Sequence, residues 1–304
     1  MNSVKFDEII SITNEKLGYD CHIALIGTKR GPAIGGCRIG KYNSTEEALS
    51  DAQLLASAML KKATVHELPH GGGKAVINLH ENHASRTAIL SDYATIVNKL
   101  SGQYITAVDS GSSNADMDII ENTTPYVLCT SKQPQTSYYT ARGVYLGLKA
   151  AAETHLGKSL QGQRFNIQGI GNVGSELIHK LVPHSKSINI CDISETRLQP
   201  FKHHNVLDNE SILSHTSDFF IPCALGGVIN QHSLTKLDTK VICGAANNQL
   251  SAAAMDAFIA EKGILYLPDF LVNGGGLIYA SNHYNNKTSD EIDQSIDNMF
   301  DRIK

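Results

Sequence analysis

The N-terminal part of the chain combines apolar runs typical of strands with spacings typical of helices. A short helical pattern comes first, in which Phe6, Ile9 and Ile10 share one face. Apolar runs then predict strands, and apolar residues at helical spacing predict helices that begin near Ser44 and Ser85. The strands are expected over residues 22–27, 75–79 and 104–109, and the helices over 44–62 and 85–100.

The second half of the chain alternates strand and helix patterns more regularly. Small or acidic residues follow several of the strands, as expected where strand ends line a cofactor crevice in a parallel sheet. Strands are predicted over 164–168, 187–191, 219–225 and 241–246, and helices over 140–155, 175–181 and 289–304. This alternation predicts a parallel sheet covered by helices.

A glycine-rich segment lies between the strand at 164–168 and the helix at 175–181. A Gly-x-Gly-x-x-Gly segment alone is weak evidence for a dinucleotide site. Between a strand and a helix, however, its glycines let the backbone approach a pyrophosphate. Asp192 closes the next strand, at about the spacing of 20 residues that the dinucleotide fingerprint requires. Its carboxylate would accept hydrogen bonds from the ribose hydroxyls and repel a 2′-phosphate. The sequence therefore predicts an NAD-binding Rossmann domain whose loop is Gly169, Ile170, Gly171, Asn172, Val173 and Gly174.

The stretch 59–77 holds a block of three glycines, 71–73, directly before Lys74. The glycines are expected to form a sharp turn that a ligand can approach closely. Lys74 then enters an apolar strand, where partial desolvation favours the neutral amine. Such a lysine can serve as a base near neutral pH. The alternative is a glycine turn followed by a solvated lysine.

Asp109 closes the predicted strand at 104–109 and precedes a run of turn-forming residues. A carboxylate at such a strand end is held by the strand and exposed by the loop, which suits a catalytic group. Alternatively, Asp109 caps the helix that starts near Ala115. The polar segment 130–138 is predicted to be a linker.

Composition limits the classes of function. The chain has 304 residues and a mass of 32.9 kDa, which favours two domains. A net charge of -4 and a pI near 6.3 give no indication of nucleic acid or an anionic membrane as a partner. The six scattered cysteines predict reduced thiols, and the histidines show no metal-ligand spacing. With neither a signal peptide nor a long apolar run, a cytoplasmic protein is expected.

Blocks of sequence resemble one known family in order along nearly the whole chain. They are GPAIGGCR, MLKKA, LPHGGGKAVI, ITAVDSGSSNADMDII, TARGVYLGLKAAA, IQGIGNVG, PCALGGVIN, CGAANNQL and PDFLVNGGG. The chain is similar to the amino-acid dehydrogenases for glutamate, leucine, phenylalanine and valine, and most closely resembles the leucine dehydrogenase branch. The lysine block is the most specific of these motifs.

The resemblance implies an α/β enzyme with the active site in a cleft between two domains. Residues 1–135 would form a substrate domain with a mixed sheet, and 136–280 a doubly wound Rossmann domain for NAD. Residues 281–304 would form a C-terminal helix returning toward the substrate domain. Such an enzyme converts an L-amino acid to its 2-oxo acid and ammonium, and family members form homo-oligomers.

The resemblance also implies roles for individual residues. Lys74 matches the lysine that activates water, Lys62 the lysine that holds the substrate carboxylate, and Asp109 the aspartate that exchanges protons with nitrogen. Gly35, Gly36 and Asn273 match substrate-binding residues, and Thr140 and Asn247 match residues that contact the nicotinamide end of the cofactor. Ala224 lies at the small-residue end of a predicted strand, where it would line the cofactor crevice.

The expected substrate is apolar. Ile34 stands where glutamate-specific relatives carry a lysine, and with Ala107 it predicts a pocket for leucine, valine or isoleucine. An aromatic substrate, phenylalanine or tryptophan, is the first alternative. A catalytically weak NAD-binding paralogue is the second. The sequence departs from the leucine branch at Val108, where an acidic residue is usual, and in its shorter linker.

Overall fold

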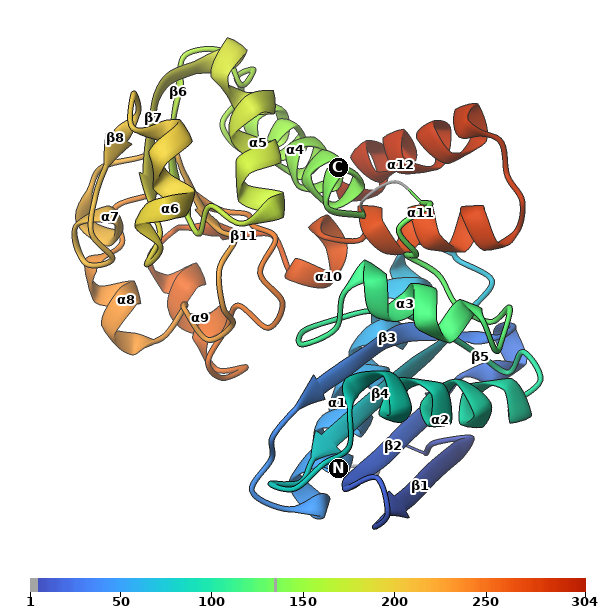
Figure 1. Cartoon of the computed structure of the whole chain (residues 1–304). Coiled ribbons are helices and arrows are strands. Elements are labelled where there is room, and N and C mark those ends of the chain that lie inside the picture. Colours follow the sequence, from blue (N-terminus) through green and yellow to red (C-terminus); the bar gives the residue numbers. More distant parts are fainter. Residues whose placement is uncertain (1–4, 134–135) are drawn as a thin grey trace. The chain divides into compact units, whose positions relative to one another are not determined.

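The computed structural model describes residues 5–133 and 136–304, so part of the predicted linker lies outside the described residues. The chain divides into two compact units (Figure 1). Unit 1 comprises Met1–Gln135 with His283–Asn286, and unit 2 comprises Thr136–Asn282 with Lys287–Lys304. Each unit has a sheet and hydrophobic clusters of its own.

Unit 1 contains the mixed sheet that the resemblance implied, with strand order β1-β2-β4-β3-β5. β1 and β2 are antiparallel, as are β2 and β4, whereas β3 runs parallel to both β4 and β5. The strands are β1 Glu8–Asn14, β2 Tyr19–Ile26, β3 Ala33–Gly40, β4 Gly71–Leu79 and β5 Tyr104–Val108.

Helices cover both faces of this sheet (Figure 1). α2 (Arg86–Lys99) and α3 (Asn114–Glu121) pack on one face, and α1 (Thr45–Val65) packs on the other through small residues. The short 3₁₀ helix η1 covers Thr28–Arg30. Ser44 accepts a hydrogen bond from the Glu47 amide and so caps α1, as its position predicts.

The short helix expected near Ile9 and Ile10 is a strand, β1. Its sequence alternates, so that Ile10 and Ile12 pack on the α2 side of the sheet while Ile9 is exposed. β-branched residues favour a half-buried strand at a sheet edge. Alternation with period two, rather than helical spacing, determines this element.

The glycine block before Lys74 is not a turn, because residues 71–73 begin β4. A Cβ at Gly72 would lie 2.2 Å from the backbone oxygen of Ala56 in α1, and a Cβ at Gly73 would lie 2.7 Å from the ring of Tyr104. These glycines therefore allow a helix and a buried tyrosine to approach the strand closely.

Unit 2 contains a parallel six-stranded sheet with the order β11-β10-β9-β6-β7-β8. This is the strand order of a dinucleotide-binding Rossmann sheet, which confirms the predicted fold class. The strands are β6 Gln163–Gln168, β7 Ser185–Cys191, β8 Asn205–Val206, β9 Phe219–Pro222, β10 Val241–Ile242 and β11 Leu265–Tyr266.

Two hydrophobic clusters lie on opposite faces of this sheet, as the alternation of Phe219 and Phe220 between them shows. The helices are α4 Thr136–Thr154, α5 Asn172–Leu181, α6 Glu195–Leu198, α7 Ser211–Ser214, α8 Gln231–Lys236, α9 Met255–Glu261, α10 Asp269–Val272, α11 Gly275–Tyr284 and α12 Ser289–Ile303, with 3₁₀ helices η2 Val182–His184 and η3 Gln199–Phe201. No helix in the described part of the chain is long and apolar enough to cross a membrane.

The last helix, α12, packs against α4 within unit 2 (Figure 1). Arg142 of α4 forms ion pairs with Asp293 and Asp297 of α12. A Cβ at Gly143 would lie 2.9 Å from a side-chain atom of Met299, so a glycine at this position allows close contact. α12 is therefore part of the packing of unit 2.

Candidate active site

One face of the unit 1 sheet gathers most of the substrate-site residues predicted there. Ala33, Cys37 and Ile39 of β3 pack into the cluster on the α2 side. Because side chains alternate along a strand, the residues between them face α1 instead. In the same way, Ala75 of β4 packs on the α2 side, so the side chain of Lys74 points to the α1 side. The α1 side thus carries Ile34, Gly36, Arg38 and Lys74, together with Ala107 and Asp109 of the β5 region.

Lys74 and Asp109 are in direct contact through Nζ and Oδ2. The other carboxylate oxygen, Oδ1, accepts a 2.6 Å hydrogen bond from the Ser110 amide. The Asp109 amide in turn donates to the Ser112 hydroxyl at 2.9 Å. α3 is capped by Ser113 rather than by Asp109. The alternative role of Asp109 as a helix cap is therefore excluded.

Lys74 is only 4% exposed, so it is not the solvated lysine of the alternative interpretation. Burial, the largest cause, and the positive charges of Arg38 and Lys62 together lower the pKa of Lys74 to about 7. The touching Asp109 carboxylate acts in the opposite direction, because it stabilises the ammonium form. A lysine held between these influences can gain and lose a proton near neutral pH.

The two glycines predicted near the substrate, Gly35 and Gly36, have a clear packing role. A Cβ at Gly35 would lie 1.7 Å from the carbonyl oxygen of Gly73 on the neighbouring strand. A Cβ at Gly36 would lie 2.7 Å from the Cβ of Asp109. Gly36 therefore leaves the space through which the lysine and the aspartate meet.

The residues predicted to surround the substrate side chain are apolar and buried. Ile34 is 1% exposed in β3, and Ala107 is buried in the neighbouring β5. Neither residue offers a charge partner to a carboxylate side chain. Lys62 lies on α1, near enough for its charge to lower the pKa of Lys74.

In unit 2 the glycine-rich loop follows β6 and leads into α5. Gly169 has a φ of 97°, which favours glycine, and a Cβ at Gly174 would lie 2.1 Å from the Gly169 carbonyl oxygen. By contrast, a Cβ at Gly171 would meet no described atom within 4 Å. The first and last glycines thus shape the loop, whereas the middle one faces open space that a phosphate group could occupy.

Asp192, after β7, is joined directly to this loop. Its Oδ2 accepts a 2.7 Å hydrogen bond from the Ile170 amide, and its Oδ1 accepts one of 2.8 Å from Ser194. Arg197 lies 3.8 Å from the same carboxylate. Each oxygen keeps acceptor capacity for a ribose hydroxyl, since a carboxylate offers about four lone-pair positions.

The other predicted cofactor residues lie at or near the carboxyl ends of the parallel strands. Ala224 follows β9 and Asn247 follows β10, and both are exposed. Thr140 of α4 donates its hydroxyl to the Thr136 carbonyl. Val173 in α5 is half-buried against the core, while Asn172 is exposed at the start of the helix. This edge is where ligands bind in open α/β sheets.

Asn273 is held in a fixed orientation by two acceptors. Its amide nitrogen donates to the Ala245 carbonyl at 3.1 Å and to the Asn247 side-chain oxygen at 2.9 Å. Its own Oδ1 is buried and has no hydrogen-bond partner among the described residues. Asn273 can therefore offer an acceptor to a ligand that carries N–H groups.

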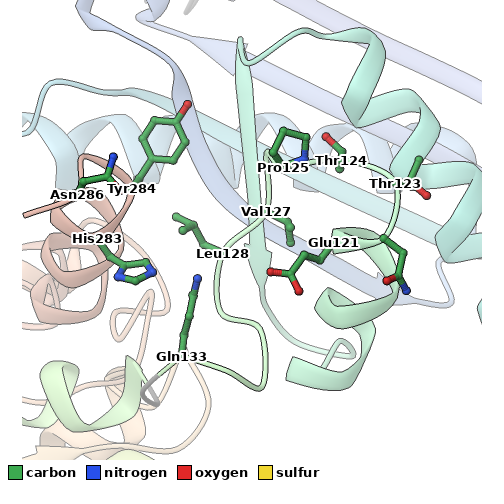
Figure 2. A pocket seen from close by; sticks show the side chains of 11 residues that line it. Glu121, Thr123, Thr124, Pro125, Val127, Leu128, Gln133, His283, Tyr284 and Asn286 are labelled. Atoms are coloured by element: carbon green, nitrogen blue, oxygen red, sulfur yellow. The ribbon is translucent and has the colours of Figure 1, made fainter.

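A cavity of about 710 Å³ lies elsewhere in unit 1 (Figure 2). Glu121 at its rim pairs with Lys132, and Leu128 and Tyr284 line it. None of the predicted site residues lines this cavity. Sequence reasoning also missed Arg38, Asp51 and their contacts beside Asp109, although Arg38 lies in the glycine-rich block that carried the family resemblance.

Family models match both parts of the chain. Residues 12–126 match the Glu/Leu/Phe/Val dehydrogenase dimerisation domain, and residues 134–196 and 185–303 match the Glutamate/Leucine/Phenylalanine/Valine dehydrogenase model. Leucine dehydrogenase from Geobacillus stearothermophilus is 35% identical over 100% of this chain and 85% of its own length.

Other relatives differ in their substrate. Valine dehydrogenase from Streptomyces virginiae is 33% identical, over 97% of this chain and 86% of the relative. The crystal structure of L-tryptophan dehydrogenase from Nostoc punctiforme is 33% identical, with a TM-score of 0.84 over 98% of this chain and 88% of that one. These similar identities confirm the family resemblance without selecting a substrate among its apolar members.

Proposed function

The chain belongs to the Glu/Leu/Phe/Val dehydrogenase family of oxidoreductases, and from this premise we propose that it oxidatively deaminates an apolar L-amino acid. Leucine, valine or isoleucine would react with NAD and water to give the 2-oxo acid, ammonium, NADH and a proton. The observation that carries this proposal is the buried contact between Lys74 and Asp109, with Lys62 nearby.

The three residues divide the work. Lys62, a cation on α1, would pair with the substrate α-carboxylate. Asp109 would take a proton from the substrate amino nitrogen and return it when ammonium leaves. Lys74 in its neutral form would accept a proton from the water that attacks the imino carbon. Asn273 would accept a hydrogen bond from the substrate amino group through its Oδ1.

The glycine-rich loop of unit 2 fits a dinucleotide. NAD would supply the two-electron acceptor when bound. The open space at Gly171 and the start of α5 would receive its pyrophosphate, since no side chain of the described residues caps that helix. Ile193 and Leu225, which are 88% and 83% exposed, follow Asp192 and Ala224 and would offer apolar surface to the adenine.

Asp192 supports NAD over NADP. Its carboxylate is fixed by the Ile170 and Ser194 amides, so it cannot turn away from an added 2′-phosphate without losing those hydrogen bonds. A buried carboxylate and a phosphate repel each other strongly. Thr140 and Asn247 would contact the nicotinamide end of the cofactor.

The apolar pair Ile34 and Ala107 supports a hydrocarbon side chain on the substrate. An aromatic substrate is the second candidate, because the L-tryptophan dehydrogenase of Nostoc punctiforme is 36% identical over 92% of this chain. An aromatic side chain is several carbon atoms larger than a branched alkyl side chain, so the volume of the pocket decides between the two candidates, at about 1–3 kcal/mol for each methylene group.

The test is a panel of substrates with the purified full chain. Initial rates of NADH formation are measured at alkaline pH with L-leucine, L-valine, L-isoleucine, L-phenylalanine, L-tryptophan and L-glutamate. We expect kcat/KM to be highest for a branched-chain substrate and negligible for glutamate. Highest values for phenylalanine or tryptophan would favour the aromatic enzyme. NAD binding without turnover of any amino acid would refute the proposal.

We also propose that the protein forms a homo-oligomer, which the match of residues 12–126 to a dimerisation domain supports. Light scattering coupled to gel filtration gives the mass in solution. A mass near 32.9 kDa would contradict this proposal.

A further inference from the structure

Arg38 is a cation that lies beside the proposed catalytic pair, Lys74 and Asp109. It lies on β3, on the same face as Lys74. Its Nε lies 3.4 Å from Oδ1 of Asp109, and its Nη1 lies 2.9 Å from Oδ2 of Asp51. The Tyr42 hydroxyl donates to the same Asp51 oxygen at 2.6 Å. Arg38 therefore links Asp109 to a carboxylate on α1.

We propose that Arg38, anchored by Asp51, is a positioning residue that confines proton exchange by Asp109 to Oδ2 and holds a constant positive charge beside the Lys74–Asp109 pair. This inference rests on the proposed function for its catalytic consequences. Arg38 would act through Asp109 and Lys74 rather than by touching the substrate.

The two oxygens of the Asp109 carboxylate have different partners. Oδ1 faces two donors, the Ser110 amide and the Arg38 guanidinium, whereas Oδ2 faces Lys74. A proton placed on Oδ1 would lie against groups that already donate there. A proton on Oδ2 meets no such conflict once Lys74 is neutral. Proton exchange is therefore directed to the side on which the lysine lies.

Ionisable groups from three elements surround Lys74. β3 contributes Arg38 and Cys37, α1 contributes Lys62 and Asp51, and the end of β5 contributes Asp109. Burial lowers the pKa of Lys74 most, and the charges of Arg38 and Lys62 lower it as well. Asp51 and Cys37 raise this pKa. Arginine does not lose its proton in proteins, so the charge of Arg38 is constant over the working pH range.

Asp51 explains how the arginine is held. Burial and the hydrogen bond to Asp51 raise the pKa of Tyr42 to about 12, so Tyr42 remains a donor to that carboxylate. Arg38 and Tyr42 thus share one oxygen of Asp51. Arg38 can contact Asp51 and Asp109 at once because its guanidinium presents several N–H groups in a fixed plane.

Two substitutions of opposite charge test this electrostatic role. Arg38→Met removes a positive charge and should raise the pKa of Lys74 by about 0.5 or more. Asp51→Asn removes a negative charge and should lower it. Arg38→Lys keeps the charge and should leave it near the wild-type value. Arg164→Met, which removes an arginine from an Arg–Asp pair in unit 2, is the matched control.

The pKa of Lys74 is read directly by NMR of the full chain labelled with [ε-¹³C]lysine. The Lys74 signal is assigned as the one lost in Lys74→Ala. This readout does not depend on turnover, so it decides the electrostatic role even if the proposed function fails. Opposite shifts in Arg38→Met and Asp51→Asn support the inference. Unchanged values, or shifts in the same direction, overturn it.

Kinetics test the positioning role on the best substrate of the panel. In Arg38→Lys we expect the pH dependence of kcat/KM to keep its midpoint while kcat falls about tenfold or more, since a lysine cannot contact both carboxylates. Wild-type kcat in Arg38→Lys would overturn the positioning role. A wild type inactive on every amino acid would instead refute the proposed function, and the NMR result would still decide the charge effect.

Discussion

Lys74 and Asp109 touch although the strands that carry them are not neighbours. β3 lies between β4 and β5 in the sheet, so the two side chains meet across β3. They do so at Gly36, where a Cβ would lie 2.7 Å from the Cβ of Asp109 and 3.0 Å from its Oδ2. A position without a side chain in the intervening strand, β3, therefore allows the contact.

Gly36→Ala should separate the lysine from the aspartate. The added methyl group occupies the space that the Asp109 side chain now fills. We expect kcat to fall by about 10²-fold, within the range that a positioned proton-transfer group contributes, while NAD binding is unchanged. Gly40→Ala, on the same strand with 3.9 Å of space for its Cβ, is the control and should keep wild-type kcat. Equal kinetics in the two variants would show that the contact is not needed.

Asp192→Ala should relax the preference for NAD over NADP. Removing the carboxylate removes the repulsion of a 2′-phosphate and also the hydrogen bond to the Ile170 amide. We therefore expect weaker binding of NAD and a ratio of kcat/KM for NAD to that for NADP at least about tenfold lower. Asp208→Ala, which removes an exposed aspartate that accepts hydrogen bonds from the Glu210 and Ser211 amides in the same unit, is the control. An unchanged ratio in Asp192→Ala would remove Asp192 from cofactor selection.

The rate of deamination should rise with pH through the titration of Lys74. Below a pKa of about 7 the amine is protonated and cannot accept a proton from water, and above it the neutral base predominates. A plot of log(kcat/KM) against pH should therefore have an acid limb with a midpoint near neutrality. Asp109 stabilises the ammonium form of Lys74, so the midpoint should move to lower pH in Asp109→Asn. This midpoint is measured on the residual activity of the variant. A rate independent of pH from 6 to 9 would argue against a lysine base.

The cofactor fold could be predicted because its signals are local. The segment from Gly169 to Gly174, the flanking strand and helix, and Asp192 lie close together in the sequence, so the order of the elements is visible in the pattern. The strands at 219–225 and 241–246 proved shorter, ending at Pro222 and Ile242. Their ends are set by hydrogen bonding between strands, which apolar runs do not show.

The substrate side was harder to predict because its contacts join distant segments. The turn expected at residues 71–73 is the beginning of a strand. The residues are glycines because α1 and Tyr104 occupy the space that side chains at Gly72 and Gly73 would take. The link from Arg38 to Asp51 and Asp109 depends on strand order, which the sequence pattern does not give. The expected placement of the active site between the two domains stays a prediction.

Replacing Lys74 tests the central claim most directly. NADH formation from the best amino-acid substrate is compared in the wild type, Lys74→Ala and Lys61→Ala, with NAD affinity measured by fluorescence in each. Lys61 is exposed and serves as the control. We predict that Lys74→Ala lowers kcat by about 10³-fold or more with NAD affinity retained, while Lys61→Ala behaves as wild type. Near-normal turnover in Lys74→Ala would contradict the role of this lysine as the base.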